Sequence, residues 1–146
     1  MGEVDVSRFV EPQRRDIDRA VAELDAGRKR SHWIWYVLPQ LVGLGSSPTA
    51  TFYGITSVAE AQAFLAHPEL GPNYRRAVAA MLAQVRAGTP LADLLGWPDD
   101  AKAVSSLTLF AGVAPPDDPL VAEVDEILTT DGRSRCPTTE AFLSSR

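Results

Sequence analysis

The chain has 146 residues, of which 45% are hydrophobic, 23% charged and 8% aromatic, and its formal net charge at pH 7 is −5. This apolar content supports one hydrophobic core and is too high for a chain that is disordered throughout. The single cysteine, Cys136, excludes an internal disulfide framework and a cysteine-rich zinc site. We therefore expect a single domain over residues 1–146, with its core at about 9–142 and with residues 1–8 loosely ordered.

The charges are unevenly distributed along the chain. Residues 31–59 have no charged side chain, whereas residues 99–131 contain eight acidic residues and one basic residue, Lys102. Nucleic acid repels an acidic protein over most of its surface, so we expect no nucleic-acid partner. The longest apolar run, residues 33–38, is far shorter than the roughly twenty residues of a membrane helix, so we expect no membrane partner. The first residues lack the features of a signal peptide, which indicates a cytoplasmic location.

Prolines and glycines alternate along the chain as signals for helix starts and ends. Capping residues precede proline at Ser47, Thr89 and Asp118, and proline is favoured at the first helical position because an N–H there would have no partner. Glycines such as Gly27 and Gly88 follow where these helices should end. The pattern is typical of short helices joined by tight connections.

In chain order, apolar periodicity predicts a helix over residues 12–26 and further helices from the capping box at Ser57, from Pro72, from Asp99 or Asp100, from Pro119 and after Thr138. The six apolar residues 33–38 fit either a buried strand or a helical turn. Ser31 as a cap and the lack of a partner strand favour a short helix that ends at Pro39. The prediction is an all-α fold, a compact single-domain multihelical array of seven to nine short helices.

Aromatic and basic side chains are concentrated in residues 27–40. Trp33 and Trp35 could stack on the ring of a ligand, while Arg28 and Lys29 bind its phosphate. The alternative is core packing, because Trp33, Tyr36 and the residue after it have helical spacing and would fill the interior.

Further polar residues complete the candidate site. His32 is the candidate for acid–base catalysis, because the ordinary pKa of imidazole lies near neutrality. Gln40 follows in the same segment, and Lys102, Ser105 and Thr108 share one predicted helix. Hydroxyls inside a helix can line a polar pocket, although bonding back to the helix carbonyls is the commoner use.

Two weaker features allow only general expectations. The glycine-rich residues 43–48 can hold an anion at the start of the following helix, or form an ordinary turn. His32 and His67, the two histidines, have no metal-ligand spacing, so we expect no metal site. The sequence indicates no particular cofactor.

Several short motifs together resemble one protein family. They are Gly27-Arg28-Lys29, Ser31-His32-Trp33 with Trp35, Pro39-Gln40, Gly43-Leu44-Gly45, Tyr53-Gly54-Ile55, His67-Pro68, and Asp100 with Lys102 and the residues up to Phe110. This pattern resembles the family called domain of unknown function 1810, over about residues 9–142. The resemblance implies a small multihelical domain and brings no established activity, cofactor or catalytic residue. Two positions depart from the family pattern: Ile17 stands in place of a usual tyrosine, and Arg135 in place of a usual aspartate.

The function expected from these residues is that of a cytoplasmic small-ligand-binding domain, with or without catalysis, for an anionic, phosphorylated or nucleotide-like metabolite. The expected ligand-binding residues are Arg28, Lys29, Trp33, Trp35, Gln40, Lys102, Ser105 and Thr108, with His32 as the catalytic candidate. One alternative is a protein–protein interaction module that uses the uncharged residues 31–59 without catalysis. Another is an accessory subunit without a ligand. A concave pocket at which His32 and Lys102 converge would favour ligand binding. The sequence leaves the oligomeric state open.

Overall fold

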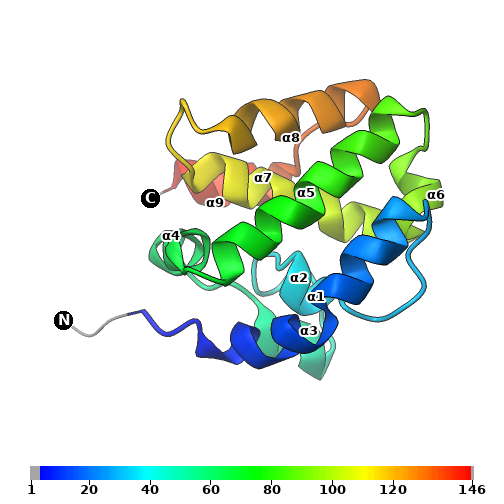
Figure 1. Ribbon diagram of the computed structural model, residues 1–146. Coiled ribbons are helices and arrows are strands. Elements are labelled where there is room, and N and C mark those ends of the chain that lie inside the picture. The colour runs from blue at the N-terminus through cyan, green and yellow to red at the C-terminus, as the bar shows by residue number, and fades with distance from the viewer. Residues whose placement is uncertain (1–3, 146) are drawn as a thin grey trace.

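The computed structural model describes residues 4–145, which form nine α-helices and one 3-10 turn (Figure 1). In chain order these are η1 Ser7–Phe9, α1 Val10–Asp25, α2 Ile34–Val37, α3 Pro48–Tyr53, α4 Val58–Ala66, α5 Leu70–Arg86, α6 Leu91–Leu95, α7 Asp99–Val113, α8 Pro119–Thr130 and α9 Pro137–Ser144. The expected all-α fold is confirmed. The extended pairing within the described residues is a single parallel bridge between Leu41 and Ile55. No helix in this part of the chain combines the length and apolar character needed to cross a membrane.

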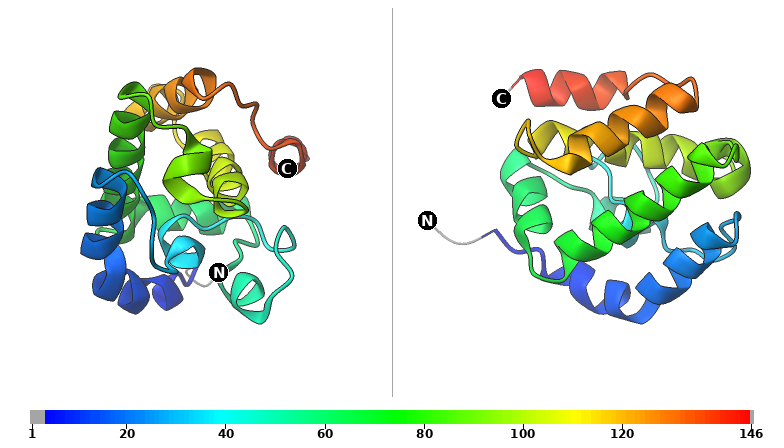
Figure 2. Two further views of the ribbon diagram at one scale, coloured as in Figure 1. Left: turned by 90° about the vertical axis from the view of Figure 1, so that its right-hand side faces the viewer. Right: turned by 45° about the horizontal axis from the view of Figure 1, so that its top comes forward.

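Helices α5 and α7 form the centre of the structure (Figures 1 and 2). Helix α5 packs against α1 on one side and α8 on the other, and α7 contacts α4, α6, α8 and α9. Every residue from Ala103 to Ala111 in α7 is buried, including its serines and threonine. The buried apolar side chains of the described residues form one continuous cluster. A helix that is enclosed on all sides in this way must satisfy its polar side chains internally.

Three of the expected helix caps are confirmed. The side chains of Ser47, Ser57 and Asp118 accept hydrogen bonds from backbone N–H groups at 3.1, 3.0 and 2.9 Å, at the starts of α3, α4 and α8. Such a bond satisfies one of the N–H groups that have no partner within the helix.

Two other expected caps are wrong. Thr89 does not cap α6, because its hydroxyl donates to the side-chain oxygen of Gln84 at 3.0 Å and the helix begins one residue later, after Pro90. Ser31 does not cap α2, because its hydroxyl donates to the carboxylate of Glu23 at 2.5 Å. In both cases a tertiary or longer-range partner replaces the local one.

Three helices begin earlier than expected. Pro12 and Pro72 were expected to begin their helices but lie at the third position of α1 and α5, and α9, expected after Thr138, begins at Pro137. A proline is tolerated throughout the first turn, because the N–H it lacks would have no helical partner there. At the start of α5, the imidazole Nδ1 of His67 accepts hydrogen bonds from the N–H groups of Glu69 and Leu70, at 3.1 and 3.2 Å.

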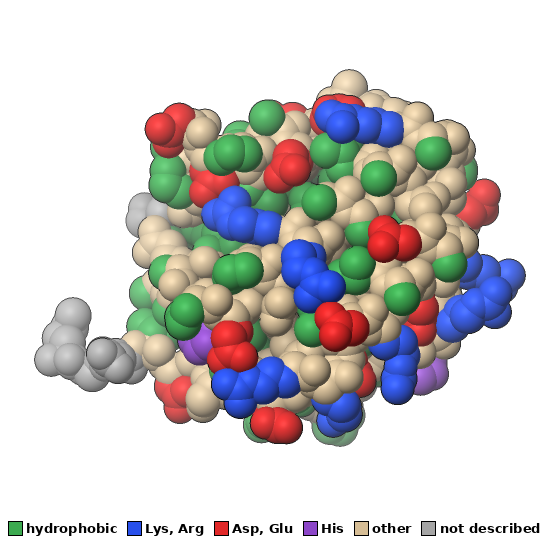
Figure 3. All heavy atoms as spheres, viewed as in Figure 1, with side chains coloured by type: hydrophobic (Ala, Val, Ile, Leu, Met, Phe, Trp, Pro, Cys, Tyr) green, Lys and Arg blue, Asp and Glu red, His purple; other side chains and the backbone are tan. Residues whose placement is uncertain are grey.

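The segment before α1 is attached to the rest of the fold; residues 1–3, the first part of the region expected to be loose, lie outside the described residues. Arg8 forms an ion pair with Glu60 at 3.0 Å and donates hydrogen bonds to the carbonyls of Phe52 and Gly54 at 2.8 and 3.0 Å. These contacts fix the end of α3. On the face shown in Figure 3, basic and acidic side chains are interspersed rather than segregated.

Candidate functional site

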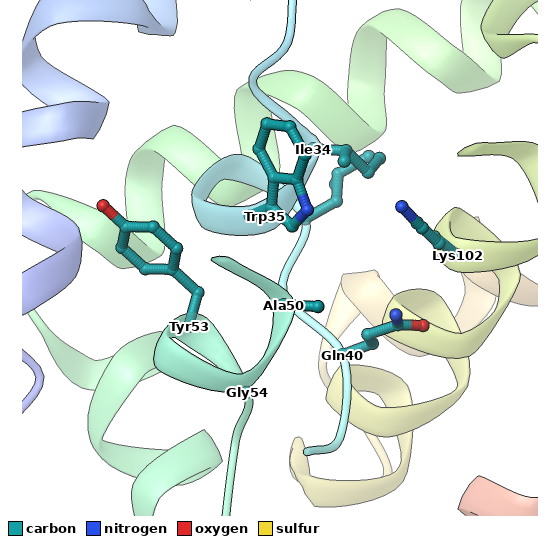
Figure 4. Close-up of a pocket in the computed structure, with 8 residues that line it drawn as sticks. Ile34, Trp35, Gln40, Ala50, Tyr53, Gly54 and Lys102 are labelled. Atoms are coloured by element: carbon teal, nitrogen blue, oxygen red, sulfur yellow. The ribbon is translucent and has the colours of Figure 1, made fainter. Parts of the chain in front are cut away.

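A cavity opens between α2, α3 and the first turn of α7 (Figure 4). It has about 250 Å³ of empty space, including its open mouth. Its lining residues are Ile34, Trp35, Leu38, Gln40, Ala50, Tyr53, Gly54 and Lys102. The structure thus brings together three of the expected ligand-binding residues, Trp35, Gln40 and Lys102, from separate segments.

The wall that contains Gln40 is fixed by its backbone. The N–H of Ile55 donates to the carbonyl of Gln40 at 2.9 Å, and the N–H of Val42 donates to the carbonyl of Ile55 at 3.0 Å. A Cβ atom on Gly54 would lie 2.6 Å from the Cα of Val42, so only glycine permits the two strands of backbone to approach this closely. The bridge therefore places the Gln40 side chain at the cavity without the help of a regular sheet.

Three N–H donors face the cavity. Figure 4 shows the side-chain nitrogens of Trp35, Gln40 and Lys102 directed toward the same space. The indole Nε1 of Trp35 is buried and has no hydrogen-bond partner among the described residues. The Gln40 amide likewise makes no hydrogen bond within residues 4–145. An unpaired buried donor costs about 1–3 kcal/mol, so its presence in a native fold calls for an explanation.

The ammonium group of Lys102 supplies the positive charge of the cavity. It lies 5.7 Å from the centre of the Trp35 ring and 3.8 Å from the carboxylate of Asp99. The other carboxylate oxygen of Asp99 binds Lys29 more closely, at 2.7 Å. Lys102 is therefore only loosely paired, and no carboxylate among the described residues lines the cavity itself.

His32 lies beside the cavity without lining it. Its ring is 6.3 Å from that of Trp35, and its side chain is exposed. No hydrogen bond to its imidazole is found in the described part of the chain, so nothing there orients the ring. Of the two residues expected to converge in one pocket, Lys102 thus lines the cavity and His32 does not.

Trp33 is part of the core and cannot present its ring to a ligand in this structure. It is fully buried, and its Nε1 donates to the carboxylate of Glu23 at 2.9 Å. The same carboxylate accepts hydrogen bonds from the N–H of Arg30, at 2.8 Å, and from the N–H and hydroxyl of Ser31. Burial would raise the pKa of Glu23, but these hydrogen bonds outweigh it and lower the pKa to about 2. Trp33 thus packs in the core, as in the alternative interpretation of its spacing.

Lys29 is also committed to the fold. Its side chain is only 5% exposed, and its ammonium group contacts Asp99 at 2.7 Å and the carbonyl of Ser31 at 2.5 Å. It also lies 5.0 Å from the centre of the Trp33 ring. Lys29 does not line the cavity, so we do not include it in the site.

The hydroxyls of Ser105 and Thr108 bond to α7 and do not line the cavity, although Ser105 lines a separate open hollow together with Cys136. Ser105 donates to the carbonyl of Ala101 at 3.2 Å, and Thr108 donates to that of Val104 at 2.8 Å. Thr108 also accepts a hydrogen bond from the N–H of Cys136 at 3.0 Å, which joins α7 to the start of α9. Bonding back to the helix, the commoner alternative for such hydroxyls, is the arrangement found.

Arg28 lies at a second, more open hollow, away from the cavity. This hollow has about 820 Å³ of empty space, much of it open to solvent, and its lining residues are Gly27, Arg28, Lys29, Ala92, Asp93, Leu95 and Gly96. The structure therefore separates Arg28 from the expected residues that line the cavity. The sequence analysis did not assign Tyr53, Ala50 or Gly54 to the cavity, although the Tyr53-Gly54 motif was available as a signal.

The two departures from the family pattern lie outside the cavity. Ile17 is buried on the face of α1 that packs into the core. Arg135 forms an ion pair with Asp125 of α8. Pro137, close behind Arg135, begins α9.

Comparison with known proteins agrees on the fold and names no activity. The family model described as "Protein of unknown function (DUF1810)" matches residues 3–142. A crystal structure of the conserved hypothetical protein Rv1873 from Mycobacterium tuberculosis is similar, with 40% sequence identity, 97% of each chain covered and a TM-score of 0.86. A search of the curated proteins gives no match.

Proposed function

This chain belongs to the DUF1810 family of proteins of unknown function, and we propose that its cavity binds a small anionic metabolite. The observation that carries the proposal is the convergence of three N–H donors, from Trp35, Gln40 and Lys102, on a space lined by no carboxylate. One of these donors is buried without a partner, and an oxyanion would satisfy it. Lys102 would supply the charge and Gln40 the second neutral donor.

The size of the cavity limits what can enter it. Its empty space of about 250 Å³ includes the open mouth, and the room inside for water-sized groups is only about 10 Å³, far below the roughly 300–1,000 Å³ of pockets for drug-sized ligands. We therefore propose that an oxygen of the phosphate group of a phosphorylated or nucleotide-like compound enters the cavity, while the rest of the compound lies at the mouth beside Trp35. In the cytoplasm, where we place the protein, such compounds are abundant. No hydrogen bond from residues 4–145 orients the His32 ring, so the proposed function is binding without catalysis.

The test is a thermal-shift screen of the full chain with inorganic phosphate, sugar phosphates, nucleotides, NAD and ADP-ribose. A ligand at 100 times its dissociation constant should stabilise the protein by roughly 2.7 kcal/mol. The indole N–H of Trp35 gives a direct readout, since its NMR resonance should move as the ligand binds.

Matched variants make the test specific. We expect Lys102→Met to abolish the response to the best ligand and Gln40→Leu to weaken it. Arg14→Met removes an exposed charge paired with Glu69, far from the cavity, and should respond like the wild type. A thermal shift that Lys102→Met leaves intact, or a Trp35 resonance that no compound moves, would refute the proposal.

A second candidate, a protein-interaction module, rests on two exposed apolar side chains within residues 31–59. Phe52 is 59% exposed and Val42 is 41% exposed, and Val42 lies against Gly54 near the end of α3. An interaction at this surface should be weakened by Phe52→Ser and Val42→Ser without changing the response to phosphate compounds. Sedimentation of wild type and variants over a range of concentrations would detect the case in which the partner is a second copy.

A further inference from the structure

A surface separate from the cavity combines two unpaired arginines with the most exposed large hydrophobic side chain of the described residues. We propose that this surface, which consists of Arg28, Arg30, Trp97 and the adjoining hollow, docks an acidic segment of a partner protein. We call it the Arg28–Trp97 surface. It does not depend on the anion site proposed for the cavity.

The two arginines differ from all the other cations that the structure describes. Within residues 4–145, every other lysine and arginine lies within 4.0 Å of an acidic group. Arg28 and Arg30 have no such partner, although the chain has more acidic than basic residues. A carboxylate that approaches Arg28 or Arg30 would therefore not have to displace an acidic side chain from an existing ion pair. At every other described lysine or arginine it would.

The backbone that carries these arginines is held firmly. The N–H of Arg28 donates to the carbonyl of Glu23 at 3.1 Å, and that of Lys29 to the carbonyl of Leu94 at 2.7 Å. The N–H of Arg30 donates to the carboxylate of Glu23 at 2.8 Å. On this side of the interface only side chains, those of the two arginines and of Trp97, would lose freedom when a partner binds, which lowers this chain's share of the entropic cost of docking.

The same hydrogen bonds bring the backbone that leads to Trp97 to this surface. The bond from Lys29 to Leu94 joins the loop after α1 to α6, and Figure 2 shows the two segments side by side. Gly96 lines the hollow together with Arg28, and Trp97 follows it directly. Trp97 is 85% exposed. Tryptophan and arginine are the residues most enriched among those that dominate the energy of protein interfaces.

The chemistry of the surface specifies its occupant. Guanidinium groups bind carboxylates through paired hydrogen bonds, and the indole ring provides an apolar contact beside them. Asp93 also lines the hollow, so carboxylates should be placed over Arg28 and Arg30 while an aliphatic side chain faces Trp97. Two free cations on a chain of net charge −5 are too few to hold a nucleic-acid backbone. A protein segment with acidic and aliphatic residues fits these requirements.

The experiment is an NMR titration of the ¹⁵N-labelled full chain with two short synthetic peptides, one of Asp, Glu and Leu, and one in which Lys replaces the acidic residues. We expect the acidic peptide to shift the Trp97 indole and the amides of residues 28–30, and the basic peptide to leave them unchanged. The shifts should diminish in 0.5 M NaCl, because the charges are exposed. The Trp35 indole should stay in place, which separates this test from that of the cavity.

Paired variants complete the design. Trp97→Ala and the double variant Arg28→Glu with Arg30→Glu should each weaken binding of the acidic peptide at least tenfold. Phe52→Ala and Arg76→Glu, which change an exposed aromatic and an exposed arginine elsewhere, should bind as the wild type does. Equal responses to both peptides, no response of the surface, or unchanged binding by the variants would overturn the proposal. Self-association that Trp97→Ala abolishes would also overturn it, since the occupant would then be a second copy of the chain.

Discussion

Trp33 and Trp35 are two residues apart, yet the structure gives them opposite environments. Trp33 is fully buried, and its N–H donates to Glu23 at 2.9 Å. Trp35 is half-buried, and its N–H is enclosed but unpaired among the described residues. This contrast shows that residue type and helical spacing do not distinguish an aromatic residue of the core from one at a binding site. What separates them is whether the fold itself satisfies the polar atom of the ring.

The largest expected effect concerns Trp33. Trp33→Ala should lower the free energy of unfolding by about 3–5 kcal/mol, because it removes a fully enclosed ring and leaves a cavity. Trp35→Ala should cost roughly half as much, since part of this ring is already in water. Urea unfolding of the two variants measures the difference. Equal losses would show that the two rings contribute alike to the core.

The next effect tests the carboxylate that holds Trp33. Because the pKa of Glu23 is lowered from an unfolded value of 4.5 to about 2, Glu23 adds stability that is complete above pH 4.5 and lost as the pH falls toward 2. Glu23→Gln should therefore lower the free energy of unfolding by up to about 3 kcal/mol at neutral pH. The difference in free energy of unfolding between Glu23→Gln and the wild type should decrease as the pH falls from 4.5 to 2.

A matched control sharpens this measurement. Glu126 forms an exposed ion pair with Arg86 on the surface of α8. Glu126→Gln should change the free energy of unfolding by less than about 1 kcal/mol at neutral pH, because such pairs are well solvated. A pH-independent gap for Glu23→Gln would contradict the role assigned to its hydrogen bonds.

A smaller effect is expected at Thr108, which extends the comparison to α7. Thr108→Val keeps the shape of the side chain but leaves the N–H of Cys136 without its partner, at a cost of about 1–2 kcal/mol. Ser105→Ala should cost less, since it removes a bond back to its own helix and a side-chain contact with Cys136 but leaves no backbone N–H without its partner. Thermal unfolding gives the stabilities, and titration with the best phosphate compound should be unchanged in both variants. A loss of binding would indicate that these hydroxyls belong to the binding site.

The smallest effect on stability is expected at the N–H of Trp35. Trp35→Phe removes a buried donor that has no partner within the described residues, so the free energy of unfolding should change by less than about 0.5 kcal/mol, or rise slightly. The same variant should weaken the binding of phosphate compounds, because one of three donors is lost. A destabilisation as large as that of Trp35→Ala would exceed the packing lost with part of the ring and would instead indicate that the N–H has a structural partner, such as bound water.

The sequence predicted the helices well because their signals are local. Ser47, Ser57 and Asp118 cap the helices they precede, and the apolar positions of each helix recur within one or two turns. The errors came where a residue of the preceding helix took the polar group, as Gln84 does for Thr89 and Glu23 for Ser31. The capping pattern relates a residue to the helix that follows it, so it does not include such partners.

For the candidate site, the residue types along the chain indicate which side chains could bind an anion, but not which of them lie together in the fold. Trp35, Gln40 and Lys102 were among eight residues proposed for one site, and the structure divides the eight among the cavity, the core, helix α7 and the Arg28–Trp97 surface. Helix formation depends on near neighbours along the chain, and the chemistry of a side chain depends on its residue type. Whether a buried N–H has a partner depends on packing between segments far apart in the sequence, and for Trp35 only the tertiary structure decided it.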